Sequence, residues 1–325
     1  MSWARINTTD KPPLAYHLLN VAGMHEYLLL AREFGDAPWL HLDGAAEWRT
    51  DDAGRAVLEA NAQRLFEWGY GVEWLTPTDM RVIEPDVVIP NAIGRVVYSA
   101  LEGYLDVAMC IGALTEAACI MGARIRTGQR VRAIIQHGGN VAGVLTDSGE
   151  RIPADIVVNC VGYWSGLLME SVGFHLPMDN TPGLTAVTAP APVRLRAVVR
   201  TGQIEIRPVG EERLLLHSRT VDRQVRDDDT GITDADAADT LWEQSVAVMP
   251  GLMETKVERV RRGVRPRPGD GFSVVGPVPG VDSCYLIATH SGVTLGPLLG
   301  RFAARELLHR EADPPLAPFR PSRFC

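Results

Sequence analysis

The sequence predicts an α/β fold in which one domain is interrupted by a second, β-rich α+β domain. Segments with strand-like and helix-like hydrophobic periods alternate towards both ends of the chain. The middle of the chain is instead a block of short strand-like segments. The length of 325 residues is sufficient for one large or two ordinary domains.

Composition narrows the class of protein. A hydrophobic content of 46% is that of a globular chain with a sizeable core. The formal net charge of -8 argues against general nucleic-acid binding. No apolar run approaches the roughly 18 residues that span a membrane, and the first residues lack the apolar core of a secretory signal. We therefore expect a cytoplasmic protein without a membrane span.

Helices dominate the first third of the chain. Periodicity and turn residues predict four elements there, the helices 16–34, 51–69 and 76–84 and the strand 41–48. Gly35 ends the first helix. Thr78 is the predicted N-cap of the third helix, and Pro85 stops it.

The next segment is predicted as a helix followed by strands and a linker. Residues 106–121 form a helix that is apolar on one side and ends at Gly122. The predicted strands behind it are 124–127, 131–136, 141–146 and 152–159. Turn-forming residues 137–140 join the middle two into a hairpin. Residues 177–192 are rich in proline and are predicted to be a linker.

A second group of elements completes the chain. The interrupting domain continues with the strands 197–199, 203–208 and 214–218 and the helix 235–249. Behind it come the strands 257–264, 273–275 and 284–288 and the closing helix 295–309. Strands that alternate with helices at both ends favour one α/β domain built from distant parts of the chain.

Several common sites are excluded by the residues. The chain has no G-x-G-x-x-G, no Walker A motif, no H-E-x-x-H and no EF-hand loop. GYWSG at 162–166 has its serine one place too late for the nucleophile elbow G-x-S-x-G. The five cysteines and eight histidines show no metal-ligand spacing, so we expect neither a disulfide framework nor a metal site.

Four stretches carry a family resemblance. They are EP at 84–85 with EGYLD at 102–106, ADIVVNCVGYWS at 154–165, GVRP at 263–266 leading to VGP at 275–277, and ATHSG at 288–292. In order and spacing they resemble the D-amino-acid oxidase-like (DAO) superfamily of FAD-dependent oxidoreductases. Its members include enzymes that oxidise glycine, sarcosine and dimethylglycine. The resemblance covers essentially the whole chain.

The resemblance implies a fold and an activity. The parts 1–37, 99–176 and 257–325 would form a Rossmann-like FAD-binding domain, and 38–98 with 177–256 a substrate domain. The implied reaction oxidises the C–N bond of an amino acid, or of a secondary or tertiary amine, by hydride transfer to the flavin. An FAD-dependent dehydrogenase of the glycerol-3-phosphate type is an alternative, because the basic segment 258–267 would also suit a phosphate.

The resemblance also implies site residues. The residues expected to contact FAD are Val131, Gly162, Trp164, Ser165, Gly276, His290, Ser291, Gly292, Val293, Thr294 and Leu295. The loop and the helix start at 289–297 would stabilise negative charge on the reduced flavin ring. Arg265 would bind the substrate carboxylate, with Arg262 and Arg267 nearby, and His290 would be a polar contact of the flavin. An ordinary structural role is the alternative for each of these residues.

One part of the family pattern is missing from the sequence. Relatives begin with a strand, a G-x-G-x-x-G turn, a helix and a second strand, and the resemblance here starts only after that unit. The sheet is therefore expected to expose an edge with apolar side chains. Three explanations stay open: a longer true protein, a partner chain that completes the FAD site, or a non-catalytic remnant that binds no flavin.

Overall fold

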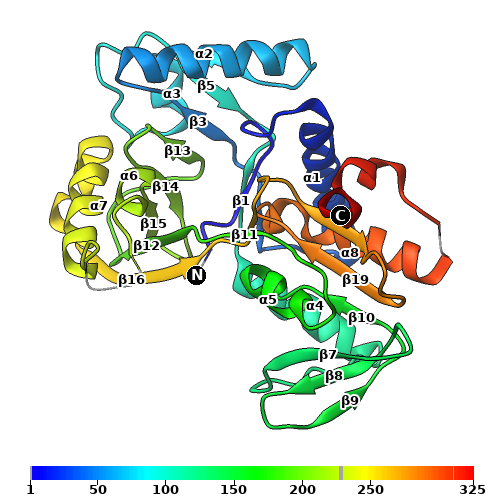
Figure 1. Ribbon diagram of the computed structural model, residues 1–325. Helices are drawn as coiled ribbons and strands as arrows, with labels where there is room; N and C mark the ends of the chain where they lie inside the picture. Colours follow the sequence, from blue (N-terminus) through cyan, green and yellow to red (C-terminus); the bar gives the residue numbers. More distant parts are fainter. Residues whose placement is uncertain (1, 227–229, 310) are drawn as a thin grey trace. The chain divides into compact units, whose positions relative to one another are not determined.

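The computed structural model describes residues 2–226, 230–309 and 311–325 (Figure 1). The chain divides into two compact units. Unit 1 consists of Met1–His17, Phe34–Cys110 and Pro182–Gly263, and unit 2 of Leu18–Glu33, Ile111–Thr181 and Val264–Cys325. None of the helices in the described ranges is long and apolar enough to cross a bilayer. The mixture of helices and sheets confirms the predicted α/β class.

Unit 1 is built on an eight-stranded sheet with the order β16-β12-β15-β14-β13-β3-β5-β4. Its strands are β3 (Ala45–Glu47), β4 (Glu73–Leu75), β5 (Val96–Ser99), β12 (Pro182–Thr188), β13 (Val198–Arg200), β14 (Glu205–Pro208), β15 (Leu214–His217) and β16 (Val257–Val264). A second sheet joins β1 (Arg5–Ile6), β6 (Gly103–Leu105) and β2 (Leu40–His41) in that order. Strands far apart in the sequence thus become neighbours.

Four helices accompany these sheets, α2 (Asp52–Glu67), α3 (Pro77–Ile83), α6 (Arg219–Asp222) and α7 (Asp234–Val248). Figure 1 shows α7 beside β14 and β15, and its buried Leu241 belongs to the same apolar core as Leu216 of β15. That core also holds Trp48 and Met80, which are almost fully buried.

The predicted N-cap of α3 is wrong. The cap is Thr76, whose hydroxyl accepts the N–H of Asp79 at 3.2 Å, while the Asp79 carboxylate accepts the N–H of Thr76 at 2.9 Å. This reciprocal pair is a capping box. Pro77 occupies the first turn, where its missing N–H costs nothing, so the cap is the residue before the proline rather than Thr78.

Unit 2 contains three small sheets. The hairpin strands β7 (Val131–His137) and β8 (Asn140–Thr146) pair as predicted, and β9 (Arg151–Pro153) joins β8. A second sheet has β19 (Cys284–Ala288) between β10 (Val157–Asn159), which is parallel to it, and β18 (Val274–Pro277), which is antiparallel. The strands β11 (Met178–Asp179) and β17 (Arg267–Pro268) form the third.

The helices of unit 2 are most of α1 (Leu14–Phe34) and α4 (Val107–Ile120), together with α5 (Ser165–Glu170) and α8 (Gly292–His309). The short helices η3 (Pro314–Phe319) and η4 (Pro321–Phe324) follow α8. The core of this unit gathers Met169 of α5 with Val274 of β18 and Leu286 of β19.

Several sequence-based predictions are wrong in detail. The segment 177–192 is no linker, because it contains β12, whose residues after Pro182 are all buried; its prolines flank the strand rather than interrupt it. The strand predicted at 152–159 is two strands in different sheets, β9 and β10. Residues 124–127 form no strand, and α8 begins at Gly292, one turn before the predicted start.

The strand predicted at 41–48 is likewise divided between β2 and β3, which belong to different sheets. Gly44 marks the break. Its φ of 93° lies in the region that favours glycine, and a Cβ there would stand 2.2 Å from the hydroxyl oxygen of Tyr98. The chain therefore turns from one sheet to the next at a position that only glycine fits.

Candidate active site

Two strand-to-helix junctions lie at one edge of the β10–β19–β18 sheet. β10 ends at Asn159 and leads through Gly162 into α5, and β19 ends at Ala288 and leads into α8. Because β10 and β19 are parallel, their carboxyl ends share an edge. In open α/β sheets, ligands bind outside the carboxyl ends of the strands. The sequence stretches 162–165 and 290–295 are thus brought to the same edge.

The first junction is held by the buried side chain of Asn159. Its Oδ1 accepts the N–H of Val161 and the hydroxyl of Ser165, both at 3.2 Å, and its Nδ2 donates to the backbone oxygen of Ser165 at 3.2 Å. Gly162 has a φ of 65°, and a Cβ there would meet only the Cβ of Pro266, at 3.7 Å. Ser165 therefore shapes the turn, while Trp164 is 58% exposed beside it.

The second junction combines buried hydroxyls with exposed backbone. The Thr289 hydroxyl contacts that of Ser273 at 2.7 Å and accepts the N–H of Ser291 at 3.0 Å. Gly292 and His290 are exposed, whereas Thr294 and Leu295 are buried. A Cβ on Gly292 would meet only the methyl group of Thr289, at 3.8 Å. The start of α8 thus offers open backbone and a positive helix end.

Helix α1 fixes the first turn of α8. Pro297 lies inside α8 and has no N–H, so the oxygen of Val293 loses its helical donor. The hydroxyl of Tyr27 donates to that oxygen instead, at 2.6 Å. A Cβ on Gly23 would stand 2.5 Å from the oxygen of Thr294, so the two helix backbones approach closely at this point. Both contacts are made to the backbone of α8, and they hold the start of this helix.

Two of the neighbouring arginines, Arg262 and Arg267, form ion pairs with residues of known position. Arg262 pairs with Asp234 at 2.6 Å, and Arg267 pairs with Asp179 at 3.5 Å. Arg265 is half-buried. Its backbone is fixed by Thr181, whose oxygen accepts the Arg265 N–H at 3.1 Å and whose hydroxyl donates to the Arg265 oxygen at 3.3 Å. The next residue, Pro266, reaches Gly162 of the first junction.

The other two residues expected to contact FAD, Val131 and Gly276, lie elsewhere in unit 2. Val131 is the first residue of β7, is half-buried and pairs with Thr146. Gly276 has a φ of 143° within β18, and a Cβ there would stand 2.8 Å from Nη1 of Arg320. Packing against Arg320 is sufficient to explain this glycine. Contact of either residue with a cofactor stays a prediction.

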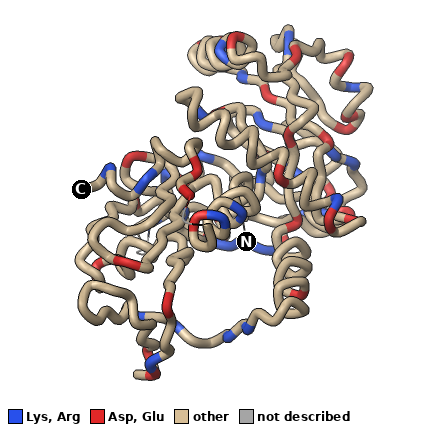
Figure 2. Tube along the Cα trace, turned by 90° about the vertical axis from the view of Figure 1, so that its right-hand side faces the viewer, with Lys and Arg blue, Asp and Glu red and all other residues tan. Residues whose placement is uncertain are grey.

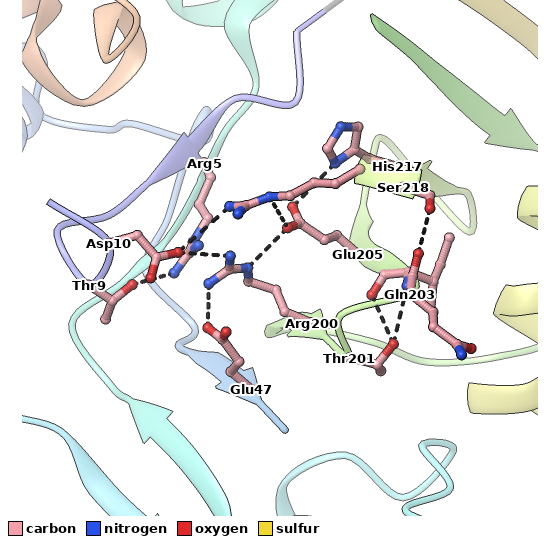
Figure 3. A network of polar contacts seen from close by, with 12 residues as sticks. Arg5, Thr9, Asp10, Glu47, Arg200, Thr201, Gln203, Glu205, His217 and Ser218 are labelled. Carbon is pink, nitrogen blue, oxygen red and sulfur yellow. Dashed lines mark hydrogen bonds and ion pairs between the residues drawn. The ribbon is translucent and has the colours of Figure 1, made fainter. Parts of the chain in front are cut away.

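A cluster of buried charges in unit 1 was not predicted from the sequence (Figure 3). Arg200 is 1% exposed and binds Glu47, Asp10 at 2.8 Å and Glu205 at 3.2 Å. His217 contacts Glu205 through Nδ1 at 3.3 Å, and Asp222 through Nε2 at 2.7 Å. We call these six residues the buried charge cluster. They come from four separate stretches of the chain, around residues 10, 47, 200–205 and 217–222, so no sequence spacing signals them.

The charges of the cluster stabilise one another. Burial opposes the charge of Arg200, but Glu47, Asp10 and Glu205 hold the pKa of Arg200 well above its usual value. Burial likewise opposes ionisation of Glu205, yet Arg200 and then His217 keep its pKa well below the usual range. The pKa of Asp10 is lowered by Arg200, Arg5 and Arg219 against the effect of burial.

The extended segment of residues 2–10 is held by further buried charges. Arg207 donates to the backbone oxygens of Trp3 at 2.6 Å and Ser2 at 3.3 Å. Glu102 is fully buried and accepts the backbone N–H groups of Thr8 at 2.8 Å and Thr9 at 2.9 Å. Glu102 also accepts the hydroxyl of Thr9 at 3.3 Å and pairs with Arg5, so it holds both the backbone and side chains of the segment.

Lys11 follows this segment and has an altered amine. Burial, and next the charge of Arg5, lower the pKa of Lys11 to about 8, against the attraction of Asp10 and Glu102. The amine therefore titrates near neutral pH. Among the described residues, no group of three or more His, Cys, Asp or Glu side chains is arranged to hold a metal ion.

Comparison with known proteins gives a family. A family model described as "FAD dependent oxidoreductase" (DAO) matches residues 2–306. The hydrogen cyanide synthase subunit HcnC of Pseudomonas aeruginosa is 26% identical over 282 residues, which are 84% of this chain and 65% of that protein. A glycine oxidase of the same organism is 30% identical over 195 residues, 59% of this chain and 52% of that protein. The chain thus spans between about half and two thirds of these relatives.

A solved structure has the same fold. The crystal structure of glycine oxidase from Geobacillus kaustophilus superimposes with a TM-score of 0.86 at 22% identity. The match covers 100% of this chain and 88% of that chain. The likeness extends over both units and includes the two junctions of the β10–β19–β18 sheet.

Proposed function

The chain belongs to the DAO family of FAD-dependent oxidoreductases, and from that premise we propose that it oxidises the C–N bond of an amino acid, or of a secondary or tertiary amine, with FAD as the hydride acceptor. The observation that carries the proposal is the pair of junctions at one sheet edge, with the Arg265 segment beside the first of them. In this proposal residues 1–37, 99–176 and 257–325 bind FAD, and 38–98 with 177–256 bind substrate.

The residues at this edge fit the ring end of FAD. Gly162, Gly292 and Gly296 leave open space where a side chain would otherwise stand. The N-terminus of α8 adds backbone N–H groups and a positive dipole that stabilise a negatively charged ring edge. Trp164, His290 and the residues 291–295 would line this end. The printed sequence holds no G-x-G-x-x-G turn for the diphosphate.

Arg265 is the candidate for substrate binding. A planar guanidinium binds a carboxylate through two parallel hydrogen bonds and so orients it. The fixed backbone of Arg265 supports such a role, because the group would start from one position. The bound carboxylate would aim the adjacent carbon at the ring end of the site. His290, exposed at the start of α8, would supply a polar contact there.

The charge pattern favours an amino acid over a phosphorylated polyol. A phosphate dianion is best bound by several cations. Arg262 and Arg267 are neutralised by Asp234 and Asp179, so less positive charge is available around Arg265 than the sequence alone suggests. A single carboxylate needs only one guanidinium. We therefore retain the amino-acid substrate in preference to glycerol 3-phosphate.

Anaerobic mixing of the FAD-loaded protein with candidate substrates tests this proposal. The panel comprises glycine, N-methylated glycines, larger amino acids and glycerol 3-phosphate, and flavin bleaching is the readout. Bleaching by an amino or imino acid supports the proposal. Bleaching by glycerol 3-phosphate alone would replace it with the phosphate alternative. A protein that binds FAD but is bleached by no amine contradicts it.

A further inference from the structure

Arg207 is a buried cation without an anionic partner. It lies on β14, is 3% exposed, and pairs with no carboxylate among the residues that the structure describes. Basic and acidic residues are interspersed along the chain (Figure 2), and the equally buried Arg200 binds three carboxylates. Burial lowers the pKa of Arg207 to about 10, and Tyr104 and then Asp106 oppose this only in part. Buried charges are normally paired, so Arg207 departs from this rule.

The register of the large sheet explains why no carboxylate stands beside Arg207. The charged row of the sheet consists of directly opposed residues on four strands, namely Glu47, Arg200, Glu205 and His217. Arg207 follows Glu205 by two residues on β14, so it lies on the same face but in the next row. Its opposed neighbour on β15 is Leu215, which in turn opposes Val187 of β12. Arg207 is therefore flanked along its row by apolar side chains.

Hydrogen bonds to backbone oxygens use part of the guanidinium. Nε of Arg207 donates to the oxygen of Trp3 at 2.6 Å, Nη1 to that of Pro208 at 2.6 Å, and Nη2 to that of Ser2 at 3.3 Å. An arginine side chain has five N–H donors, so one N–H on each Nη has no acceptor in the described part of the chain. Carbonyl oxygens are neutral, and these three bonds therefore leave the positive charge uncompensated.

The indole of Trp3 provides another unused donor. Its Nε1 is buried and has no hydrogen-bond partner among the described residues, and the centre of the ring lies 5.7 Å from the guanidinium carbon of Arg207. Trp3 packs against the core formed by Ala45, Val198 and Tyr104. The ring of Tyr104 lies 4.9 Å from the same guanidinium carbon. Arg207 is thus held between two aromatic rings, with unused donors on both itself and Trp3.

We propose that Arg207 and the indole N–H of Trp3 form a binding site for a small-molecule carboxylate within unit 1. N–H donors without acceptors require a ligand that accepts, and an ionised carboxylate has acceptors and no donor. Its single negative charge balances one guanidinium, whereas a phosphate dianion is best bound by several cations. Trp3 is half-buried and Ser2 exposed, so solvent borders the site on this side. The carboxylate belongs either to the substrate or to a separate small molecule.

Titration of the flavin-free full chain with acetate, followed by proton NMR, tests the site directly. Indole N–H signals appear in a region of their own, and the chain has seven tryptophans. The signal of Trp3 is identified by its loss in Trp3→Phe. We expect acetate to shift this signal downfield, whereas neutral acetamide, and sodium chloride at the same ionic strength, leave it in place. The readout needs neither flavin nor turnover, so it stands even if the proposed oxidation fails.

Matched substitutions separate the site from general effects on the protein. Arg207→Lys keeps the charge but loses the fork of donors, and should weaken acetate binding about 10–100-fold in calorimetry. Trp3→Phe removes one N–H and should weaken it about tenfold. The controls are Arg95→Lys and Trp74→Phe, because Arg95 is an exposed arginine of the same unit that stacks on Trp74 at 4.1 Å. Should Arg207→Lys fail to fold, the two tryptophan variants still decide.

Turnover by the FAD-loaded protein identifies the source of the carboxylate. If the site holds the substrate carboxylate, acetate competes with the amino acid, and Trp3→Phe raises KM while kcat is kept. If the ligand is a separate molecule, acetate binds in the titration without competing for the substrate. Both results support the carboxylate site.

Three results would overturn the proposal. One is a Trp3 indole signal that acetate does not move. Another is an equal shift with acetamide or with sodium chloride, since the site would then hold any polar molecule or an adventitious ion only. The third is an equal loss of acetate affinity in the site variants and in their controls at Arg95 and Trp74.

Discussion

The hydroxyl of Tyr27 lies 2.6 Å from the backbone oxygen of Val293, the oxygen that Pro297 leaves without a helical donor. Tyr27→Phe removes the donor and leaves that oxygen unpaired, which should cost about 1–3 kcal/mol of unfolding free energy. Urea denaturation of the variant and the parent protein measures this loss. Pro297→Ala restores a backbone N–H, so Tyr27→Phe should cost less in that background. Equal costs in both backgrounds would contradict this assignment.

The close approach of α1 and α8 predicts opposite effects of one substitution at two helix positions. Gly23→Ala would place a Cβ 2.5 Å from the oxygen of Thr294, so we expect a loss of stability as the helices separate. Gly112→Ala on α4 meets nothing within 4 Å and should stabilise by about 0.5–1 kcal/mol through helix propensity. Thermal melts of both variants test this, and stabilisation by Gly23→Ala would refute the close approach.

The buried charge cluster predicts a pH dependence of stability. Arg200 lowers the pKa values of Asp10 and Glu205 below their ordinary values of 3.8 and 4.5. Near these pKa values the folded chain therefore binds fewer protons than the unfolded chain. The stabilisation by the cluster is complete above about pH 5 and is lost as the pH falls. Urea midpoints between pH 3 and 7 should rise with pH.

Removal of Arg200 tests the same cluster, because the stability that is lost should itself depend on pH. Arg200→Met leaves buried carboxylates without their cation, which should cost about 3–5 kcal/mol near neutral pH. The carboxylates of the variant then ionise less readily, so its deficit should shrink as the pH falls. Arg95→Met is the control, because Arg95 pairs with Glu59 on the surface. A deficit that is constant with pH would show that Arg200 acts through packing alone.

Lys11 should be unusually reactive for a lysine. Because its pKa is lowered to about 8, its amine is largely neutral at pH 8.5, whereas an unperturbed amine is still protonated. Acetylation followed by mass spectrometry should give a rate profile for Lys11 with a midpoint near pH 8. Lys256, the other lysine of the chain, is labelled in the same sample as reference. A Lys11 midpoint above pH 10 would contradict the burial of this amine.

Arg265 should affect binding of carboxylate substrates. Arg265→Lys keeps the charge but loses the paired hydrogen bonds, so KM should rise about 10–100-fold, the equivalent of roughly 1.5–3 kcal/mol. An amine without a carboxylate should be oxidised as before. Arg267→Lys is the control, because Arg267 is exposed and paired with Asp179. Equal effects of both variants would remove Arg265 from the substrate site.

Local signals in the sequence were sufficient for the α/β class and for the two junctions. The run 284–288 with its following glycine predicts the strand and turn at β19, and the hairpin of β7 and β8 follows from its turn residues. Each of these features is encoded within a few neighbouring residues. The family resemblance adds the prediction that both junctions face the cofactor.

The buried charge cluster could not be predicted in this way. Glu47 and Arg200 meet because β3 and β13 are parallel neighbours, an arrangement set by the order of eight strands rather than by any spacing. The strand β12 was missed because prolines at 182 and 190 surround a run of apolar residues. In both cases the packing of distant segments decides the structure.

The contacts that hold residues 2–10 predict which positions can vary among related sequences. Arg207 binds backbone oxygens of the segment, whereas Glu102 binds the N–H groups of Thr8 and Thr9 and also the Thr9 hydroxyl and Arg5. Natural variation should therefore be rare at Arg207 and Glu102, and rarer at Thr9 than at Ser2, whose contact with Arg207 is made by its backbone oxygen. In evolutionary terms, the fixed residues lie far along the chain from the segment that they hold.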